Sequence, residues 1–265
     1  MQLAGKTAIV TGAGQGIGNT IAARLMQEGA NVATLEWDAT LAATLGPALE
    51  AQAANGTRAH VVVGDVTSAA DVERAFDQTE QAFGPVNLLV NNAGVASLAL
   101  IVDMTEEQWD QTIAVCLKGV FLCTREFARR AIAAGSGGNI VNLSSLNWQQ
   151  ATDGLGHYCA AKAGVSQLTK VAASELGRYG VRVNAVAPGV TRTPMAEGGF
   201  LAGKMGEEFI AHTPLGRIGE MADVAAVATF LLSDEARWIT GATIPVDGGA
   251  HVRGLHSYWD TMMGG

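Results

Sequence analysis

Short apolar runs alternate with amphipathic stretches along almost the whole chain. Seven runs are dense in Val, Ile and Leu and are predicted to be strands: residues 6–11, 31–36, 59–64, 86–91, 139–144, 181–187 and 242–246. Because apolar residues fill these runs instead of alternating with polar ones, both faces of each strand should be covered. This pattern is typical of a parallel sheet.

Helical periodicity fills the intervals between these runs. Helices are predicted over residues 16–28, 69–83, 105–134, 157–178 and 221–232. Thr105 and Gln108 have the spacing of a capping box, whereas Gly46-Pro47 should interrupt the segment after the second strand. The β–α alternation predicts a single-domain α/β fold over residues 1–250, a Rossmann-like, doubly wound, seven-stranded parallel sheet with helices on both faces. The glycine-containing stretch 191–213 is predicted to be a mobile lid over the substrate.

Composition excludes several classes of protein. The 265 residues are 48% hydrophobic and 16% charged, which is too apolar for a disordered chain. The net charge of −8, with no basic cluster, disfavours nucleic-acid binding. No apolar run approaches the ~18 residues of a membrane span, the first residues lack a signal-peptide pattern, and the three cysteines lack zinc-type spacing. We therefore expect a cytoplasmic protein that acts on a small molecule without a metal, a membrane or nucleic acid.

A glycine-rich turn, TGAGQGIG, follows the first predicted strand and leads directly into a helix. Glycines let the backbone approach a pyrophosphate, and the helix N-terminus offers unpaired N–H groups to it. The candidate residues are Gly12, Gln15, Gly16, Ile17 and Gly18. Glu36 ends the second strand 18 residues beyond Gly18, where a carboxylate can accept the adenosine ribose hydroxyls and repel a 2′-phosphate. With no basic residue at Gln15 or Trp37, NAD is predicted over NADP.

The spacing TGxxxGxG, together with motifs that follow it in order, identifies a family. These motifs are Asp65-Val66, the NNAG segment at 91–94, the YxxxK segment that begins at Tyr158, Pro188-Gly189 with Thr193, and the segments 239–241 and 246–249. Over residues 5–250 the chain resembles the short-chain dehydrogenase/reductase family, in its branch of about 250 residues. The resemblance implies further cofactor contacts from Asp65, Val66, Asn92, Ala93, Gly94, Tyr158, Lys162, Pro188, Gly189, Thr191 and Thr193.

The predicted catalytic residues are Ser145, Tyr158 and Lys162. Tyr158 and Lys162 are four residues apart on a predicted helix, so their side chains share a face. A phenol is a poor base at neutral pH, and a neighbouring ammonium and the positive nicotinamide ring favour its ionised form. Tyr158 would then take the alcohol proton as hydride leaves. Ser145 matches the family's catalytic Ser and would hold the substrate oxygen.

One position departs from the family pattern. Cys116, in the segment VCLKG, stands where relatives usually carry an Asn that holds a water between the Lys and solvent. A thiol is a weak hydrogen-bonding group. The departure puts the proton relay in doubt and leaves the hydride transfer as predicted.

Polar residues near the predicted site suggest a polar substrate. They are Asn147, Trp148, Gln149, Gln150, His157, Arg192 and Glu197. Ser145, Asn147, Tyr158 and Arg192 are predicted substrate contacts, and a sugar, polyol or sugar acid is the expected substrate. An apolar secondary alcohol or a 3-oxoacyl thioester is the alternative. A non-catalytic dinucleotide-binding protein is a remote alternative, because a binder has no need of Ser145, Tyr158 and Lys162 together.

Two expectations concern assembly. Segments 105–134 and 157–178 carry more apolar side chains than one sheet face needs, among them Val120, Phe127 and Val171. The resemblance implies that these helices form an interface in a homo-oligomer, usually a tetramer. The tail 251–265 lies beyond the family's usual end yet is rich in large side chains. Residues 258–262 are predicted to pack over the active site of a neighbouring subunit in preference to their own.

Overall fold

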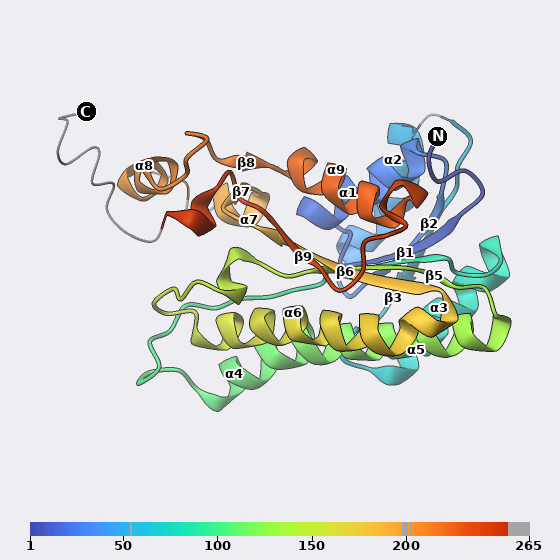
Figure 1. Cartoon of the computed structure of the whole chain (residues 1–265), viewed down its shortest axis with the longest axis horizontal. Helices are drawn as coiled ribbons and strands as arrows, with labels where there is room; N and C mark the ends of the chain where they lie inside the picture. The colour runs from blue at the N-terminus through green and yellow to red at the C-terminus, as the bar shows by residue number, and fades with distance from the viewer. Residues whose placement is uncertain (54, 198–200, 202, 254–265) are drawn as a thin grey trace.

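One seven-stranded sheet forms the centre of the molecule (Figure 1). The computed structural model describes residues 1–53, 55–197, 201 and 203–253. All strands of this sheet run parallel, in the order β3-β2-β1-β4-β5-β6-β9. Their bounds are β1 Thr7–Thr11, β2 Asn31–Glu36, β3 Ala59–Val63, β4 Leu88–Asn91, β5 Gly138–Leu143, β6 Val181–Pro188 and β9 Thr243–Val246. Each predicted run therefore matches a strand to within two residues at either end, and the predicted doubly wound sheet is confirmed.

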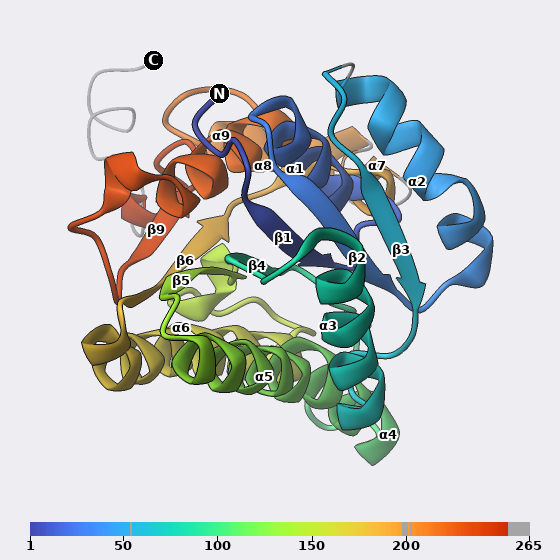
Figure 2. The same ribbon diagram turned by 90° about the vertical axis from the view of Figure 1, so that its right-hand side faces the viewer.

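Helices cover both faces of the sheet (Figures 1 and 2). One layer contains α1 (Gly16–Gln27), α2 (Ala39–Ala53) and α9 (Met221–Leu232), and the other contains α3 (Ala69–Phe83), α4 (Glu106–Ile113), α5 (Gly119–Ala134) and α6 (Gly156–Leu176). The fully buried strand β1 shows how the two cores divide, because successive side chains point to opposite faces. Ala8 and Val10 join the cluster formed with α1 and α9, whereas Ile9 joins the cluster formed with α3 and α5.

A smaller structure follows β6, in the stretch predicted to be a lid. It contains the two-stranded parallel sheet of β7 (Thr191–Arg192) and β8 (Gly219–Glu220), with the helices α7 (Pro194–Glu197) and α8 (Gly203–Ala211) between them. Residues 258–262, predicted to reach an active site, lie outside the described residues. Within the described residues, no helix combines the length and hydropathy that a membrane crossing requires.

The predicted helix 105–134 differs from the structure in its middle. The capping box at its start is present, with the Gln108 N–H donating to Thr105 Oγ1 at 3.3 Å and the Thr105 N–H donating to Gln108 Oε1 at 3.0 Å. Between α4 and α5, however, residues Ala114–Lys118 form a π-helical turn. Such turns are rare and are frequent at functional sites. This one contains Cys116, whose side chain is fully buried.

The predicted interruption at Gly46-Pro47 is wrong, because α2 continues through Pro47. Leu45 and Leu49 lie four residues apart on the buried face of α2 and join the core with α1. Pro47 is exposed, as is Ala43, whose carbonyl loses its helical donor and can bind water instead. Burial of the leucine face outweighs the local cost of the proline.

Replacing Pro47 with Ala should raise the free energy of unfolding by about 1–3 kcal/mol, because the new N–H can donate to the Ala43 carbonyl. Urea unfolding followed by circular dichroism measures the change. Ala48→Ser, at the exposed neighbouring position, is the control and should change stability by less than about 0.5 kcal/mol. An unchanged or lower stability of Pro47→Ala would show that the proline costs this helix nothing.

Candidate active site

A cleft of about 730 Å³ lies where the strands end at their carboxyl termini. The strand order reverses between β1 and β4, and ligands of open α/β sheets bind at such a point. Of the predicted cofactor residues, all except Gly18 line this cleft: Gly12, Gln15, Gly16, Ile17, Glu36, Asp65, Val66, Asn92, Ala93, Gly94, Tyr158, Lys162, Pro188, Gly189, Thr191 and Thr193. Segments far apart in the sequence therefore meet in one cleft.

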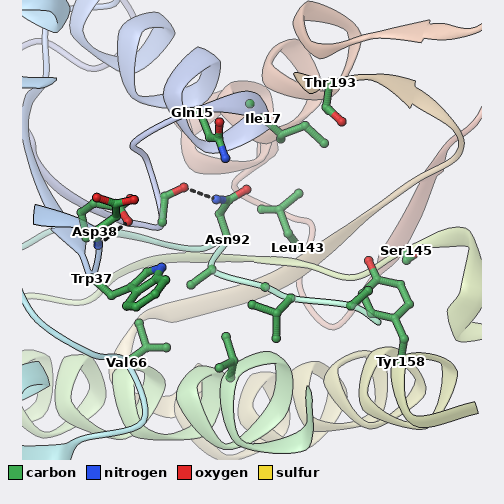
Figure 3. A pocket seen from close by; sticks show the side chains of 18 of the residues that line it. Gln15, Ile17, Trp37, Asp38, Val66, Asn92, Leu143, Ser145, Tyr158 and Thr193 are labelled. Carbon is green, nitrogen blue, oxygen red and sulfur yellow. Dashed lines mark hydrogen bonds between the residues drawn. The ribbon is translucent and has the colours of Figure 1, made fainter. Parts of the chain in front are cut away.

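Asn92 holds the glycine-rich turn in place (Figure 3). Its Nδ2 donates to the carbonyl oxygens of Thr11 at 3.0 Å and Gly12 at 2.8 Å. Gly18 packs directly behind this contact, and a Cβ there would overlap the side chain of Asn92 and the carbonyl of Gly12. Gly18 thus allows the close approach that shapes the turn, although it does not line the cleft itself.

The carboxylate of Glu36 lies at one end of the cleft and is only 3% exposed. Oε2 accepts the N–H of Gly14 at 2.8 Å, and Oε1 accepts the N–H of Asp38 at 3.2 Å. Asp38 and Asp65 also line the cleft. Among the described residues that line it, Lys162 is the one basic side chain. The end of the cleft near Glu36 is therefore acidic.

Helix α6 supplies Tyr158 and Lys162. The Tyr158 ring rises from this helix with its hydroxyl directed toward Ser145 (Figure 3). Lys162 is 3% exposed, and its Nζ lies 5.4 Å from the centre of the Tyr158 ring, within the range of a cation–π contact. The same Nζ donates to the carbonyl of Leu143 at 2.7 Å. A phenol, a hydroxyl and a buried ammonium therefore converge at the other end of the cleft.

Asn147 lies behind Ser145 and does not line the cleft. Its N–H donates to Ser145 Oγ at 3.2 Å, and the Ser145 hydroxyl donates to Asn147 Oδ1 at 3.3 Å. Asn147 Nδ2 donates to Thr152 Oγ1 at 2.6 Å. In this arrangement Asn147 orients the Ser145 hydroxyl.

Cys116 contacts the segment that follows β4. The N–H of Val95 donates to Cys116 Sγ at 3.3 Å, and Sγ in turn donates to the Val95 carbonyl at 3.2 Å. Cys116 and Lys162 both lie beside Gly94. A Cβ at Gly94 would lie 3.6 Å from Cys116 Sγ and 3.8 Å from Lys162 Nζ. The thiol thus fixes the backbone of Val95, which lines the cleft.

The polar residues predicted to surround the substrate do not line this cleft. Arg192 is half exposed and forms ion pairs with Glu197 at 3.4 Å and Glu220 at 3.3 Å. His157 is fully buried. The signal missed in the sequence is the apolar run LALIV, residues 98–102, which directly follows the cleft-lining residues Val95 and Ala96. Four of its side chains are exposed: Leu98 65%, Leu100 56%, Ile101 82% and Val102 87%.

Comparison with known proteins identifies clear relatives. The family model described as Enoyl-(Acyl carrier protein) reductase matches residues 12–251. A (3R)-3-hydroxyacyl-CoA dehydrogenase of Canis lupus familiaris is 38% identical over 257 residues, which are 95% of this chain and 98% of the relative. A 3-oxoacyl-(acyl-carrier-protein) reductase of Staphylococcus aureus is 38% identical over 247 residues, 93% and 98% of the two chains.

Solved structures agree with these relatives. The crystal structure of levodione reductase has a TM-score of 0.90 at 33% identity and covers 94% of this chain and 99% of its own. A short-chain type dehydrogenase/reductase from Mycobacterium ulcerans has a TM-score of 0.92 at 32% identity, with 100% and 96% covered. The likeness thus extends across the sheet, both helical layers and the cleft.

Replacing Cys116 with Asn should keep kcat within about twofold of the unmodified protein or raise it, because an amide can also accept from and donate to the Val95 backbone. Cys116→Ala removes both bonds and should lower kcat/KM about tenfold, since small displacements of cleft residues are costly. Steady-state kinetics of both variants measure these changes.

The control is Cys123→Ala in α5. Burial raises the pKa of the Cys123 thiol to about 12, so this side chain stays uncharged and serves as core packing. Its loss should lower stability with little effect on kcat/KM. A large loss of activity in Cys116→Asn would instead give the thiol a chemical task of its own.

Proposed function

The chain belongs to the short-chain dehydrogenase/reductase family and is an oxidoreductase of CH–OH donors that uses a nicotinamide cofactor; we propose that it uses NAD and acts on 3-hydroxyacyl or 3-oxoacyl thioesters. One observation supports the choice of substrate: the exposed side chains at residues 98–102, which follow the cleft-lining residues Val95 and Ala96 in the chain, are apolar. The names of the dog and staphylococcal relatives, which act on such thioesters, support the same class.

Acyl thioesters are the alternative substrate class predicted from the sequence, and we now prefer them to the sugar, polyol or sugar acid that the sequence favoured. Two of the polar side chains behind that expectation are engaged elsewhere. Arg192 pairs with Glu197 and Glu220, and Asn147 Nδ2 donates to Thr152 Oγ1. Hydrocarbon chains bind best where apolar side chains remove them from water, and Leu100, Ile101 and Val102 offer such a surface.

The residues of the cleft fit a nicotinamide dinucleotide. The turn at 12–18 has no room for a Cβ at Gly12, where one would lie 2.9 Å from Ala93 Cα, so bare backbone faces the cleft. The N-terminus of α1 begins at Gly16, in the position that binds a pyrophosphate. For the choice of NAD, the support is the acidic end around Glu36, where a 2′-phosphate would meet carboxylates and, among the described residues that line this end, no basic side chain.

The proposed mechanism assigns one task to each catalytic residue. A nicotinamide, when bound in the cleft, would accept the hydride of the carbinol carbon in oxidation and return it to the carbonyl carbon in reduction. In the oxidation direction, the Tyr158 oxygen takes the hydroxyl proton of the substrate. The Ser145 hydroxyl, whose oxygen is held by the Asn147 N–H, turns its proton from Asn147 Oδ1 to the substrate oxygen as that oxygen becomes a carbonyl. The Lys162 ammonium, 5.4 Å from the Tyr158 ring, stabilises the ionised phenol.

We also infer that the protein assembles with itself, as the family resemblance implies. Several side chains predicted for the interface, Val120 and Phe127 among them, belong to the core instead. Val171, also predicted for the interface, is exposed, and so are three further large apolar side chains on the layer of α4 to α6: Trp109, Phe121 and Ile132. A second copy of the chain would remove this surface from water. We also propose that residues 191–213 form a mobile lid over the substrate, and that residues 258–262 pack over the active site of a neighbouring subunit.

A substrate panel tests the proposed class. With NAD, 3-hydroxybutyryl- and 3-hydroxyoctanoyl-coenzyme A should give kcat/KM values at least about 100-fold above those of gluconate, sorbitol and glucose, because the apolar surface at 98–102 gains nothing from hydroxyl groups. NADH formation at 340 nm measures the rates. Faster oxidation of a sugar or polyol than of either thioester would overturn the assignment.

Tyr158→Phe should lower kcat about 10²–10⁴-fold on the best substrate, because the phenolic oxygen acts on the proton in the transition state. NADH binding, measured by fluorescence, should stay within about threefold. Tyr179→Phe is the matched control: Tyr179 is 45% exposed just after α6 and should be replaceable without loss. Near-normal turnover by Tyr158→Phe would mean that another residue is the base.

Glu36 should set the cofactor preference. The unmodified protein should use NAD at least about 100-fold better than NADP in kcat/KM, and Glu36→Gln should narrow this ratio about tenfold by removing the charge alone. Glu36→Ala should narrow it too and also raise KM for NAD, since the ribose hydroxyls lose their acceptor. Equal use of both cofactors by the unmodified protein would contradict the proposal.

A further inference from the structure

His157 directly precedes Tyr158 and is bound through both ring nitrogens while fully buried. Nδ1 lies 2.9 Å from the backbone N of Tyr158, and Nε2 lies 2.9 Å from Ser97 Oγ. Because a backbone N–H can only donate, Nδ1 is the acceptor. The ring proton is then on Nε2 and is donated to Ser97.

On the helix side, this imidazole replaces a missing cap. Helix α6 begins at Gly156, and its N-cap residue, Leu155, has no side chain that could accept a hydrogen bond. The first N–H groups of a helix lack partners within the helix. The Nδ1 of His157 satisfies the N–H of Tyr158, and so fixes the backbone at the base itself.

On the loop side, Ser97 belongs to the segment between β4 and α4. This segment lines the cleft as far as Ala96 and then carries the apolar side chains at 98–102. It is tied to the start of α6 at one further point, where the Ala99 N–H donates to the Gly154 carbonyl at 3.0 Å. A Cβ at Gly154 would lie 2.8 Å from Leu98 Cδ1, so the two segments are in close contact.

We propose that His157 is a positioning residue that sets the apolar segment 97–102 in register with Tyr158, a role that rests on the proposed function. The rigid imidazole accepts on one edge and donates on the other. A substrate whose chain lies against residues 98–102 therefore meets the phenol with its carbinol oxygen at a fixed offset. Without the link, a chain bound at residues 98–102 would meet a less firmly placed surface, so loss of the link should weaken substrate binding more than it slows the reaction.

The two bonds can be removed separately. Ser97→Ala removes the loop-side bond alone. His157→Asn keeps an acceptor at the δ position for the Tyr158 N–H, but its amide is too short to reach Ser97 Oγ. His157→Phe removes both bonds and keeps a ring of similar size.

Ser97→Ala and His157→Asn should each raise KM for 3-hydroxyoctanoyl-coenzyme A about 3–10-fold and change kcat by less than about threefold. The double variant should be no worse than either single variant, because both changes break the same bond. His157→Phe should add a fall in kcat of about 10–100-fold. Binding of NADH should stay within about twofold in all of them.

Thr169→Val is the matched control for simple loss of stability. Thr169 is fully buried in α6, accepts from Asn142 Nδ2 at 2.9 Å and donates to the Val165 carbonyl at 2.8 Å, far from Tyr158 along the helix. It should lower Tm about as much as Ser97→Ala while leaving KM unchanged. A KM shift in Thr169→Val equal to that in Ser97→Ala would assign the effect to stability and overturn the proposal.

Amide hydrogen exchange gives a readout that needs no turnover. In Ser97→Ala and His157→Asn, peptides covering residues 95–104 should exchange at least about fivefold faster, while peptides from α9 are unchanged. Exchange tests the His157–Ser97 link independently of the proposed substrate. If the protein oxidises no thioester but the variants exchange faster, the proposed substrate is refuted and the link is supported. Unchanged exchange, or additive effects of the two single variants on KM, would refute the link.

Discussion

The contact between Asn92 and the turn after β1 is the constraint on which the cleft depends. Parallel strands β1 and β4 are neighbours whose chains continue to opposite sides of the sheet, so their carboxyl ends must separate. The Asn92 amide bridges the separation through the carbonyls of Thr11 and Gly12. With those carbonyls turned toward Asn92, the bare backbone of the turn faces the cleft, and Gly18 leaves the space that the arrangement needs.

The segment that follows Asn92 links cofactor chemistry to substrate binding. Two side chains from different helices fix it: Cys116 of the π-helical turn binds Val95, and His157 of α6 binds Ser97. Between these points the backbone lines the cleft, and beyond them it presents apolar side chains to solvent. Helix α6 also carries Tyr158 and Lys162, the groups that would handle the proton. Movement of this segment would therefore alter both functions together.

The elements that could be predicted from the sequence are those determined by residues close together in the chain. Strands and the glycine turn depend on neighbours within a few residues, and Thr105 with Gln108 formed the predicted capping box. Prediction from the sequence failed where distant contacts outweigh local preference. Pro47 remains inside α2 because Leu45 and Leu49 are buried against α1, and Cys116 in the π turn is bonded to Val95, which is 21 residues away. Neither partner could be read from local periodicity.

The same distinction explains why the substrate appeared polar from the sequence. Two of the polar side chains judged available for a ligand are bound inside the protein: Asn147 Nδ2 donates to Thr152 Oγ1, and Arg192 pairs with Glu197 and Glu220. A paired polar group offers a ligand little, because binding would have to break an existing bond to form a new one. What remains for recognition is the reacting carbinol, held at Ser145 and Tyr158, and the apolar surface at 98–102. The proposed acyl thioester would meet such a site through hydrocarbon contact and the placement of one oxygen, whereas a polyol would leave most of its hydroxyl groups without partners.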